Sequence, residues 1–260
     1  MKPNEVDPFI KSVAPFVTAL LRSPKGKRPE SVGTALLVEA RGAHFLISAA
    51  HVLDEGNKLW FFPGARDPRP VVGQAAFSRA RWQKSGTDRF DVGVVRLAER
   101  LPEPYNGWHP VDIANLRSRS FTDDDASFAF VGYPCTRVKV NPVRKKINVA
   151  YMALNGAVQA QAEVYLRLGF DPAHHLILHL DRTPKLIDGK SSQFPDPHGL
   201  SGSPVWSSDE NGSFIVGIVT EYHKTEGVIV ATEIGQVLQL LAHAERDYAH
   251  LFPQGFPPKP

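Results

Sequence analysis

The sequence contains a single cysteine, Cys135, and this scarcity excludes an intrachain disulfide bond. Disulfide bonds belong to oxidising compartments, so a chain without them is expected in a reducing one. The chain also lacks an apolar run of the roughly 18 residues that a membrane span requires. Its first 23 residues contain early acidic side chains and prolines, and they lack the apolar region and cleavage site of a signal peptide. These absences predict a soluble, cytoplasmic protein that does not act at a membrane.

An excess of charge of one sign is also missing. Lysine and arginine total 30 and aspartate and glutamate total 27, which gives a formal net charge of +3. The basic runs KGKR (25–28) and RKK (144–146) are short and far apart. Such runs are typical of solvated loops and differ from the continuous basic surface of a nucleic-acid-binding protein. We therefore expect no nucleic-acid partner.

The chain is rich in residues that punctuate short strands, with 20 glycines and 22 prolines spread along its length. Residues 33–40 and 44–50 predict a β-hairpin, and the β-branched run at 90–97 predicts a strand buried on both faces. Residues 98–126 are rich in proline, asparagine and aspartate and are the best candidate for a linker. The second half has further strand-like segments at 127–134, 147–154, 157–168, 175–181, 203–208 and 214–222. This pattern predicts an all-β protein of two barrels or sandwiches, spanning residues 13–115 and 126–252.

The end of the chain has a different periodicity. Apolar residues recur at close to helical spacing after residue 233, which predicts a C-terminal helix packed against the second half. These residues are Ile234, Val237, Leu238, Leu241, Tyr248 and Leu251. Residues 253–260 contain four prolines and are expected to be a disordered tail.

The segment HGLSGSPVW (198–206) places Ser201 close to two glycines. An ordinary tight turn is one interpretation, because serine and glycine are common turn residues. The other interpretation is a nucleophile facing a reacting carbonyl. The freedom of Gly199 lets its N–H point to the same place as the N–H of Ser201, which would form an oxyanion hole with two donors.

A nucleophilic serine needs a base and an acid to orient that base, and the sequence offers a candidate for each. His51 follows directly after an apolar strand that ends in small residues, so its imidazole is expected at a strand end. Asp91 begins the buried strand at 90–97, where a carboxylate needs a hydrogen-bonding partner. Asp88 is its rival, although it falls in the turn GTDR. The nucleophile elbow of the α/β-hydrolases does not fit, because a strand follows Ser201 and the aspartate and histidine precede it.

The segments SAAHV, DVGVVRL and GLSGSPV occur in the order histidine, aspartate, serine, at separations of 40 and 110 residues. In this order they resemble the chymotrypsin/trypsin-like serine peptidases, in particular their disulfide-free bacterial relatives. The segments GTALLVE, GYP and GIVTEY also resemble text of that family, so the resemblance extends over roughly residues 15–242. It implies two six-stranded antiparallel β-barrels followed by the C-terminal helix, with the site in the cleft between the barrels.

The resemblance also implies roles for individual residues. Ser201 would be the nucleophile, His51 the general base and then acid, and Asp91 the residue that orients His51. The N–H groups of Gly199 and Ser201 would bind the oxyanion, and the strand Val219–Glu221 would pair with an extended substrate. The residue before the nucleophile is Leu200, where digestive trypsins have an aspartate that pairs with a newly cut N-terminus. Activation by such cleavage is therefore not implied. Ser203, in place of the family's second glycine, is expected to be structural.

The substrate pocket is less determined by the sequence. Its floor is expected before the nucleophile, where Asp196 would attract a basic side chain or His198 would hydrogen-bond to a polar one. Its walls are expected from Thr220 to Tyr222, with Glu221 between them, and Tyr222 is a candidate to fill part of the pocket. The alternative interpretation is that Asp196, His198 and Tyr222 are loop residues without a substrate role.

Two other groups are candidates for different chemistry. The histidines of HHLILH (174–179) lack a third and fourth ligand at zinc spacing, and His175 and His179 are expected on a solvated face of a strand. Cys135 has no histidine nearby in the sequence and is expected to be structural.

The leading hypothesis is therefore a cytoplasmic serine endopeptidase that needs no metal or cofactor and cuts a protein or peptide substrate at a limited site. The alternative hypothesis is a peptidase-like binding or scaffold module that is catalytically inactive or latent until an activating protein partner reshapes the oxyanion loop.

Overall fold

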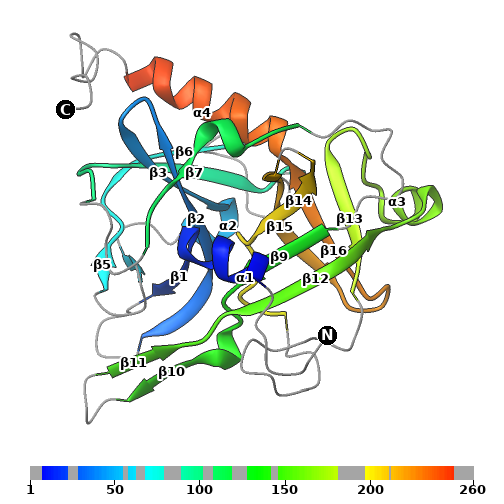
Figure 1. Cartoon of the computed structure of the whole chain (residues 1–260), viewed down its shortest axis with the longest axis horizontal. Coiled ribbons are helices and arrows are strands. Elements are labelled where there is room, and N and C mark those ends of the chain that lie inside the picture. The colour runs from blue at the N-terminus through cyan, green and yellow to red at the C-terminus, as the bar shows by residue number, and fades with distance from the viewer. Residues whose placement is uncertain are drawn as a thin grey trace.

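The computed structural model describes residues 8–22, 29–54, 58–62, 68–78, 89–101, 108–118, 128–141, 146–180, 197–210 and 212–248. Two strand-rich halves lie side by side, and a long helix near the C-terminus lies along one side of both (Figure 1). The expected tail at residues 253–260 lies outside the described residues. Among the described residues, no helix is both long enough and apolar enough to cross a bilayer.

The first half forms one curled sheet of eight strands. Seven of them follow the order β5-β4-β1-β2-β3-β7-β6, and β8 pairs in parallel with β2. The strands are β1 (Val17–Arg22), β2 (Glu30–Ala40), β3 (Ala43–Ala49), β4 (Leu59–Phe61), β5 (Arg69–Pro70), β6 (Gly73–Phe77), β7 (Val92–Leu97) and β8 (Val111–Asp112). The short helices of this half are α1 (Pro8–Val13), η1 (Ala14–Phe16), α2 (Ala50–Leu53) and η4 (Ile113–Asn115).

The second half forms a closed barrel in the strand order β12-β13-β16-β15-β14-β9. Its strands are β9 (Phe128–Gly132), β12 (Met152–Gln159), β13 (His175–His179), β14 (Pro204–Asp209), β15 (Gly212–His223) and β16 (Val228–Glu233). A hairpin of β10 (Val138–Asn141) and β11 (Lys146–Val149) extends from it, and the helical segments are η5 (Cys135–Arg137), α3 (Ala162–Leu168) and α4 (Ile234–Tyr248). The predicted all-β class with a C-terminal helix is confirmed. The division of the chain at residues 115 and 126 stays a prediction.

The two halves share a hydrophobic core. The largest cluster of buried apolar residues contains Ile47 and Val94 from the first half, Val131 and Ile218 from the second, and Val237 from α4. Each half also has its own apolar cluster, on the other faces of the same strands. Strands such as β7, which is buried along nearly its whole length, therefore have apolar side chains on both faces. Because this core is continuous between the two halves, it fixes the position of one half relative to the other.

Helix α4 differs from its prediction in what it packs against. Ile234, Val237 and Leu241 are buried, as the helical spacing predicts. The helix contacts β15 and β16 of the second half, and it also contacts β6 and β7 of the first. The prediction of packing against the second half was incomplete, because periodicity identifies the apolar face of a helix and says nothing of its partner.

The predicted strand at 157–168 is wrong beyond Gln159. Strand β12 ends there, and Ala162–Leu168 form helix α3. Alanine, glutamate, leucine and arginine favour a helix, and Gly169 ends it in the left-handed conformation, with φ +76°. The helix buries Tyr165, whose hydroxyl accepts a 2.8 Å hydrogen bond from the N–H of Ile177 in β13. Packing against the barrel therefore supports the helix.

Candidate active site

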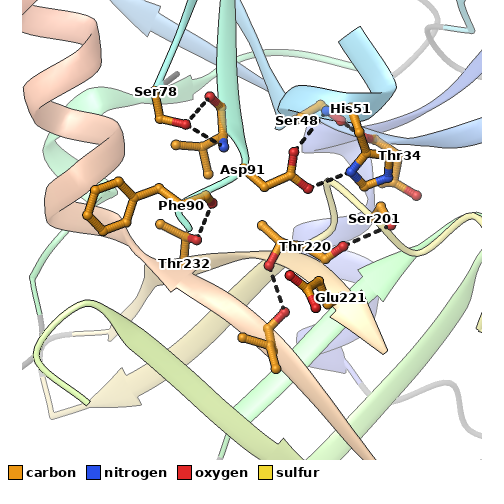
Figure 2. Close-up of polar contacts among 12 residues, drawn as sticks. Thr34, Ser48, His51, Ser78, Phe90, Asp91, Ser201, Thr220, Glu221 and Thr232 are labelled. Carbon is orange, nitrogen blue, oxygen red and sulfur yellow. Dashed lines mark hydrogen bonds and ion pairs between the residues drawn. The ribbon is translucent and has the colours of Figure 1, made fainter. Parts of the chain in front are cut away.

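Adjacent strands of the first half bring His51 and Asp91 together. His51 lies in α2, immediately after β3, and Asp91 immediately precedes β7. Strands β3 and β7 are antiparallel neighbours, with Ala49 paired to Val92, so the end of one meets the start of the other. Residues 40 apart in the sequence therefore lie side by side (Figure 2). The rival Asp88 lies outside the described residues.

The Asp91 carboxylate contacts His51 through both of its oxygens. Its Oδ2 lies 2.5 Å from Nδ1 of the imidazole, and its Oδ1 accepts a 2.9 Å hydrogen bond from the His51 backbone N–H. The Asp91 carbonyl also accepts a 2.7 Å hydrogen bond from the Ala50 N–H. Because the carboxylate only accepts, this contact assigns a proton to Nδ1 and leaves Nε2 of a neutral ring as the acceptor. The His51 side chain is 40% exposed and that of Asp91 is 17% exposed, so the imidazole lies at the surface and the carboxylate beneath it.

Ser201 reaches the same place from the second half, on the turn that enters β14. The turn is anchored on β15, because the Gly202 N–H donates to the Val219 carbonyl at 2.7 Å and the Val219 N–H donates to the Ser203 carbonyl at 2.8 Å. The Ser201 hydroxyl donates to the Thr220 carbonyl at 3.2 Å (Figure 2). Within the part of the chain that is described, no hydrogen bond joins Ser201 Oγ to His51. The nucleophile candidate thus rests on β15 beside the imidazole.

Residues 197–201 form what we call the nucleophile turn, and every carbonyl oxygen in it accepts a hydrogen bond. Backbone N–H groups hold four of the five: the Leu200 N–H donates to the Pro197 carbonyl (2.9 Å), that of Cys135 to His198 (2.8 Å), that of Ser203 to Leu200 (2.9 Å) and that of Thr34 to Ser201 (2.9 Å). The Thr34 hydroxyl donates to the remaining carbonyl, that of Gly199, at 2.9 Å. The orientation of each peptide plane in the turn is therefore fixed by a partner.

The two N–H groups predicted to bind an oxyanion have no acceptor among the described residues. In a trans peptide the N–H and C=O point in opposite directions, so a bound carbonyl also fixes the N–H of the next residue. The His198 carbonyl is held by Cys135, which directs the Gly199 N–H away from that contact. The Leu200 carbonyl is held by Ser203, which does the same for the Ser201 N–H. Free donors beside a hydroxyl are the arrangement that an oxyanion hole requires.

Two glycines permit this turn. Gly199 has φ +98° and Gly202 has φ +90°, values that L side chains rarely adopt. A Cβ on Gly199 would lie 2.7 Å from the Cys135 nitrogen, and one on Gly202 would lie 1.9 Å from the Thr34 carbonyl oxygen. Both glycines are thus required by backbone conformation, and also by a close neighbour, which is Cys135 of the second half for Gly199 and Thr34 of the first half for Gly202.

The neighbours of Ser201 in the sequence are buried. Leu200 is 1% exposed and is part of the apolar core inside the second barrel. Ser203 is fully buried, its backbone holds both the turn and β15, and its hydroxyl has no partner among the described atoms. Leu200 and Ser203 thus anchor the turn that carries Ser201, Leu200 through the apolar core and Ser203 through its backbone hydrogen bonds.

The edge of β15 beyond the turn is the candidate surface for an extended peptide. Strand β14 pairs with β15 only as far as Ile218, whereas β16 pairs with its other side as far as His223. On that edge Glu221 and Tyr222 are exposed, Tyr222 by 37%, and Glu221 lies 3.1 Å from His223 Nε2. Thr220 is buried, with its hydroxyl donating to the Val230 carbonyl at 3.3 Å.

The predicted pocket floor is described only in part. His198 is exposed at the start of the nucleophile turn, where its backbone contacts Cys135. Asp196 lies outside the described residues, so its predicted role stays a prediction.

Sequence reasoning missed three contributors to the site. Thr34 holds the nucleophile turn with its hydroxyl and its N–H, Ser48 donates to the Thr34 carbonyl at 2.6 Å, and the Cys135 N–H holds the His198 carbonyl. Thr34 falls in GTALLVE and Ser48 in SAAHV, two of the segments that resemble the peptidase family. The family resemblance was the only signal there, because a contact across 165 residues has no periodicity.

The expectation that His175 lies on a solvated face is wrong. His175 is 4% exposed, its Nε2 lies 2.8 Å from the Arg89 carbonyl, and its Nδ1 lies 3.1 Å from the Asp171 carbonyl. Helix α3 and Phe170 cover this face of β13, which alternation along one strand does not reveal. His179 is exposed. No cluster of three or more metal-ligating side chains occurs in the described ranges.

No protein-family model and no curated protein matches this chain. Among solved structures, it is similar to the crystal structure of the scabies mite inactivated protease paralogue S-I1, with a TM-score of 0.61. The match covers 94% of this chain and 99% of that one, at 14% sequence identity. The chain has a chymotrypsin-like fold. At 14% sequence identity the similarity shows the architecture of the chain, and the activity of Ser201 has to be tested by experiment.

Proposed function

We propose that this protein is a serine endopeptidase, a hydrolase of the trypsin-like kind that acts through His51, Asp91 and Ser201. The observation that carries the proposal is the nucleophile turn. Its carbonyls are all held, its N–H groups at Gly199 and Ser201 have no acceptor among the described residues, and it brings the Ser201 hydroxyl beside an imidazole bound to Asp91. An ordinary turn has no need of this combination.

Substrate binding would free the nucleophile. An extended peptide that adds to the edge of β15 would donate a backbone N–H to the Thr220 carbonyl, which is where the Ser201 hydroxyl now donates. The hydroxyl would then rotate toward Nε2 of His51. Strand addition would in this way couple the arrival of a substrate to the activation of Ser201.

The chemical steps follow from the assigned protons. Ser201 Oγ would attack the peptide carbonyl carbon while His51 Nε2 takes the hydroxyl proton, and the N–H groups of Gly199 and Ser201 would bind the resulting oxyanion. The imidazolium, stabilised by Asp91, would give that proton to the leaving amine as the C–N bond breaks. Water would then hydrolyse the acyl-enzyme, with His51 as base, which releases the acid and restores Ser201. Every proton is supplied by the chain or by water, so the mechanism uses no cofactor.

The substrate we propose is a protein or peptide partner cut at a limited site in the cytoplasm, as a chain without disulfides suggests. Besides the backbone groups named above, the exposed side chains of Glu221 and Tyr222 on the β15 edge and of His198 at the turn would contact it. Their exposure beside Ser201 supports this role.

A second candidate function is a peptidase-like module that binds peptides without cutting them, or that waits for an activating partner. The bond between the Ser201 hydroxyl and Thr220, rather than His51, favours it. The similar scabies mite protein is named as an inactivated protease paralogue, which is also compatible with it. The edge of β15 beyond Ile218, which pairs with no strand among the described residues, would serve this function equally well.

The deciding experiment is the intact mass of the protein after incubation with a fluorophosphonate. We expect one adduct on Ser201 in the native chain, none in Ser201→Ala, and an unchanged adduct in Ser208→Ala, which removes an exposed serine of β14. Asp91→Asn is expected to slow labelling by up to about 10⁴-fold, because the wrong tautomer of His51 is then favoured. A well-folded native chain that takes up no label would reject the endopeptidase in its free form and favour the binding module.

A further inference from the structure

Thr34 is a buried residue of the first half that contacts the nucleophile turn of the second half twice. Its hydroxyl donates to the Gly199 carbonyl at 2.9 Å, and its backbone N–H donates to the Ser201 carbonyl at 2.9 Å. The residue is 0% exposed and lies within β2, where it pairs with Ala19 of β1. Thr34 thus holds two of the five carbonyl groups of the nucleophile turn.

The Thr34 hydroxyl is itself held in place. It accepts a 2.9 Å hydrogen bond from the Tyr133 N–H, so its single proton is directed to the Gly199 carbonyl. The Thr34 carbonyl accepts a 2.6 Å hydrogen bond from the Ser48 hydroxyl. With its donors and acceptors engaged and its side chain buried, Thr34 has one orientation available.

The peptide that this hydroxyl holds is the central one of the oxyanion site. The Gly199 carbonyl belongs to the peptide between Gly199 and Leu200, which lies between the two peptides that supply the Gly199 and Ser201 N–H groups. If the central peptide rotates, the ψ of Gly199 and the φ of Leu200 change, and the neighbouring N–H groups lose their common direction. Gly199 has no Cβ and φ +98°, so its own conformational preference does not resist that rotation.

We propose that Thr34 is a positioning residue for the oxyanion hole and that it acts through its hydroxyl. It fixes the central peptide of the nucleophile turn and, together with Cys135 and Ser203, which hold the flanking peptides, keeps the Gly199 and Ser201 N–H groups directed toward the reacting carbonyl. This inference rests on the proposed hydrolytic function for its catalytic consequence, whereas the orientation of the turn stands without it.

The test is Thr34→Val, which keeps the shape of the side chain and removes the hydroxyl. Hydrolysis of a 4-nitrophenyl ester is expected to lose about 10- to 100-fold in kcat with little change in KM, less than the 10²–10³ of an oxyanion donor removed outright. Thr34→Ser keeps the hydroxyl and is expected to keep kcat near the native value. Thr34→Ala replaces the valine variant in every comparison if the latter does not fold.

The matched control is Thr18→Val. Thr18 is also fully buried, in β1, and its hydroxyl accepts a 2.8 Å hydrogen bond from the Phe62 N–H, away from the turn. This variant is expected to lose stability as Thr34→Val does and to keep kcat. If Thr34→Val keeps native kcat while the native chain is labelled at Ser201, the positioning role is overturned and the proposed function stands.

A second readout works without activity. The backbone amide ¹H–¹⁵N resonances of Gly199 and Ser201 are expected to shift in Thr34→Val and to stay in place in Thr18→Val. If fluorophosphonate leaves the native chain unlabelled, the hydrolytic function fails, and these resonances alone decide the inference. Resonances that do not move in Thr34→Val would overturn it.

Discussion

The hydroxyl of Thr232, in the second half of the chain, donates a hydrogen bond to the carbonyl of Phe90 in the first half. Next to it, His175 Nε2 lies 2.8 Å from the Arg89 carbonyl, and the rings of His175 and Phe90 stack at 5.9 Å. The following residue is Asp91, whose φ of +46° lies in a region that costs a non-glycine residue about 1–2 kcal/mol. The second half thus holds the strained segment that presents Asp91, as Thr34 of the first half holds the turn that presents Ser201.

Thr232→Val tests this tether. Removing the hydroxyl leaves the partly buried Phe90 carbonyl with one donor fewer, so the free energy of unfolding should fall by about 1–3 kcal/mol. The looser Asp91 should also lower kcat for ester hydrolysis several-fold, while Thr232→Ser keeps both quantities close to native. Denaturant unfolding and ester kinetics measure the two effects. A variant with native kcat and reduced stability would limit Thr232 to a role in folding.

Gly202→Ala tests the close approach of the two halves at the nucleophile turn. Its Cβ would lie 1.9 Å from the Thr34 carbonyl oxygen and 2.1 Å from the Ser48 hydroxyl, and its φ is +90°. We expect a loss of about 3 kcal/mol or more in the free energy of unfolding, since both strain and overlap must be relieved.

The matched control is Gly227→Ala. Gly227 also has a positive φ, +64°, and a Cβ there would meet nothing within 4 Å. This variant should lose only about 1–2 kcal/mol, the cost of the backbone conformation alone. Equal losses in the two alanine variants would contradict the close approach at Gly202.

We predict that the Glu221 carboxylate gives a preference for a basic residue at one position of the substrate. Opposed residues of an antiparallel pair have side chains on the same face. If the residue whose carbonyl is attacked lies opposite Thr220, the residue before it lies opposite Glu221, whose exposed carboxylate is 3.1 Å from His223 Nε2. A lysine at that position should raise kcat/KM over glutamine by about 1.5- to 5-fold, as for a surface ion pair of 0.2–1 kcal/mol.

Paired peptides that differ only at this position, compared at low and high salt, measure the preference. Glu221→Gln should abolish it and Glu210→Gln, an exposed carboxylate elsewhere, should leave it unchanged. A lysine preference that survives in Glu221→Gln would assign it to another residue.

We expect the stability of the protein to change with pH in the alkaline range because Tyr133 is buried. Burial raises the pKa of its phenol well above the ordinary value, and the neighbouring Tyr151 phenol raises that pKa further. Above about pH 10 the unfolded chain loses this proton while the folded chain keeps it. The free energy of unfolding should therefore fall as pH rises, by up to about 1.4 kcal/mol per pH unit from this group.

Denaturant unfolding between pH 9 and 11 measures the effect. Tyr133→Phe should make the decline shallower, and Tyr222→Phe, at an exposed position, should leave it as it is. A decline of native steepness in Tyr133→Phe would show that another group causes it.

The features predicted successfully from the sequence are those that local chemistry determines. Short apolar segments between turn residues predicted the all-β class, and helical spacing predicted α4 and its buried Ile234, Val237 and Leu241. The sequence also named His51, Asp91 and Ser201, which the structure brings to one place, although their roles remain proposals. Three short motifs in a fixed order were sufficient for that.

The features that the sequence did not predict depend on contacts between distant segments. His175 is buried because Phe90 and Phe170 lie against it, and α4 reaches the first half because the shared core extends under it. Thr34 bonds to the turn across 165 residues. Helix α3 was missed for another reason: AEVYLRL alternates enough to suit a strand, although Gly169, which ends the helix, is a local signal against one.

The side chain of Leu200 links the nucleophile to the folding of the second barrel. It is buried among the barrel's core residues, where a charged side chain would be stable only when paired with an opposite charge. The turn around Ser201 therefore takes its shape when the barrel forms, in the same cooperative event. If Ser201 cuts peptides, the shape of its turn would not depend on an ion pair between residue 200 and a newly cut N-terminus, and access of a peptide to the β15 edge would then limit its action.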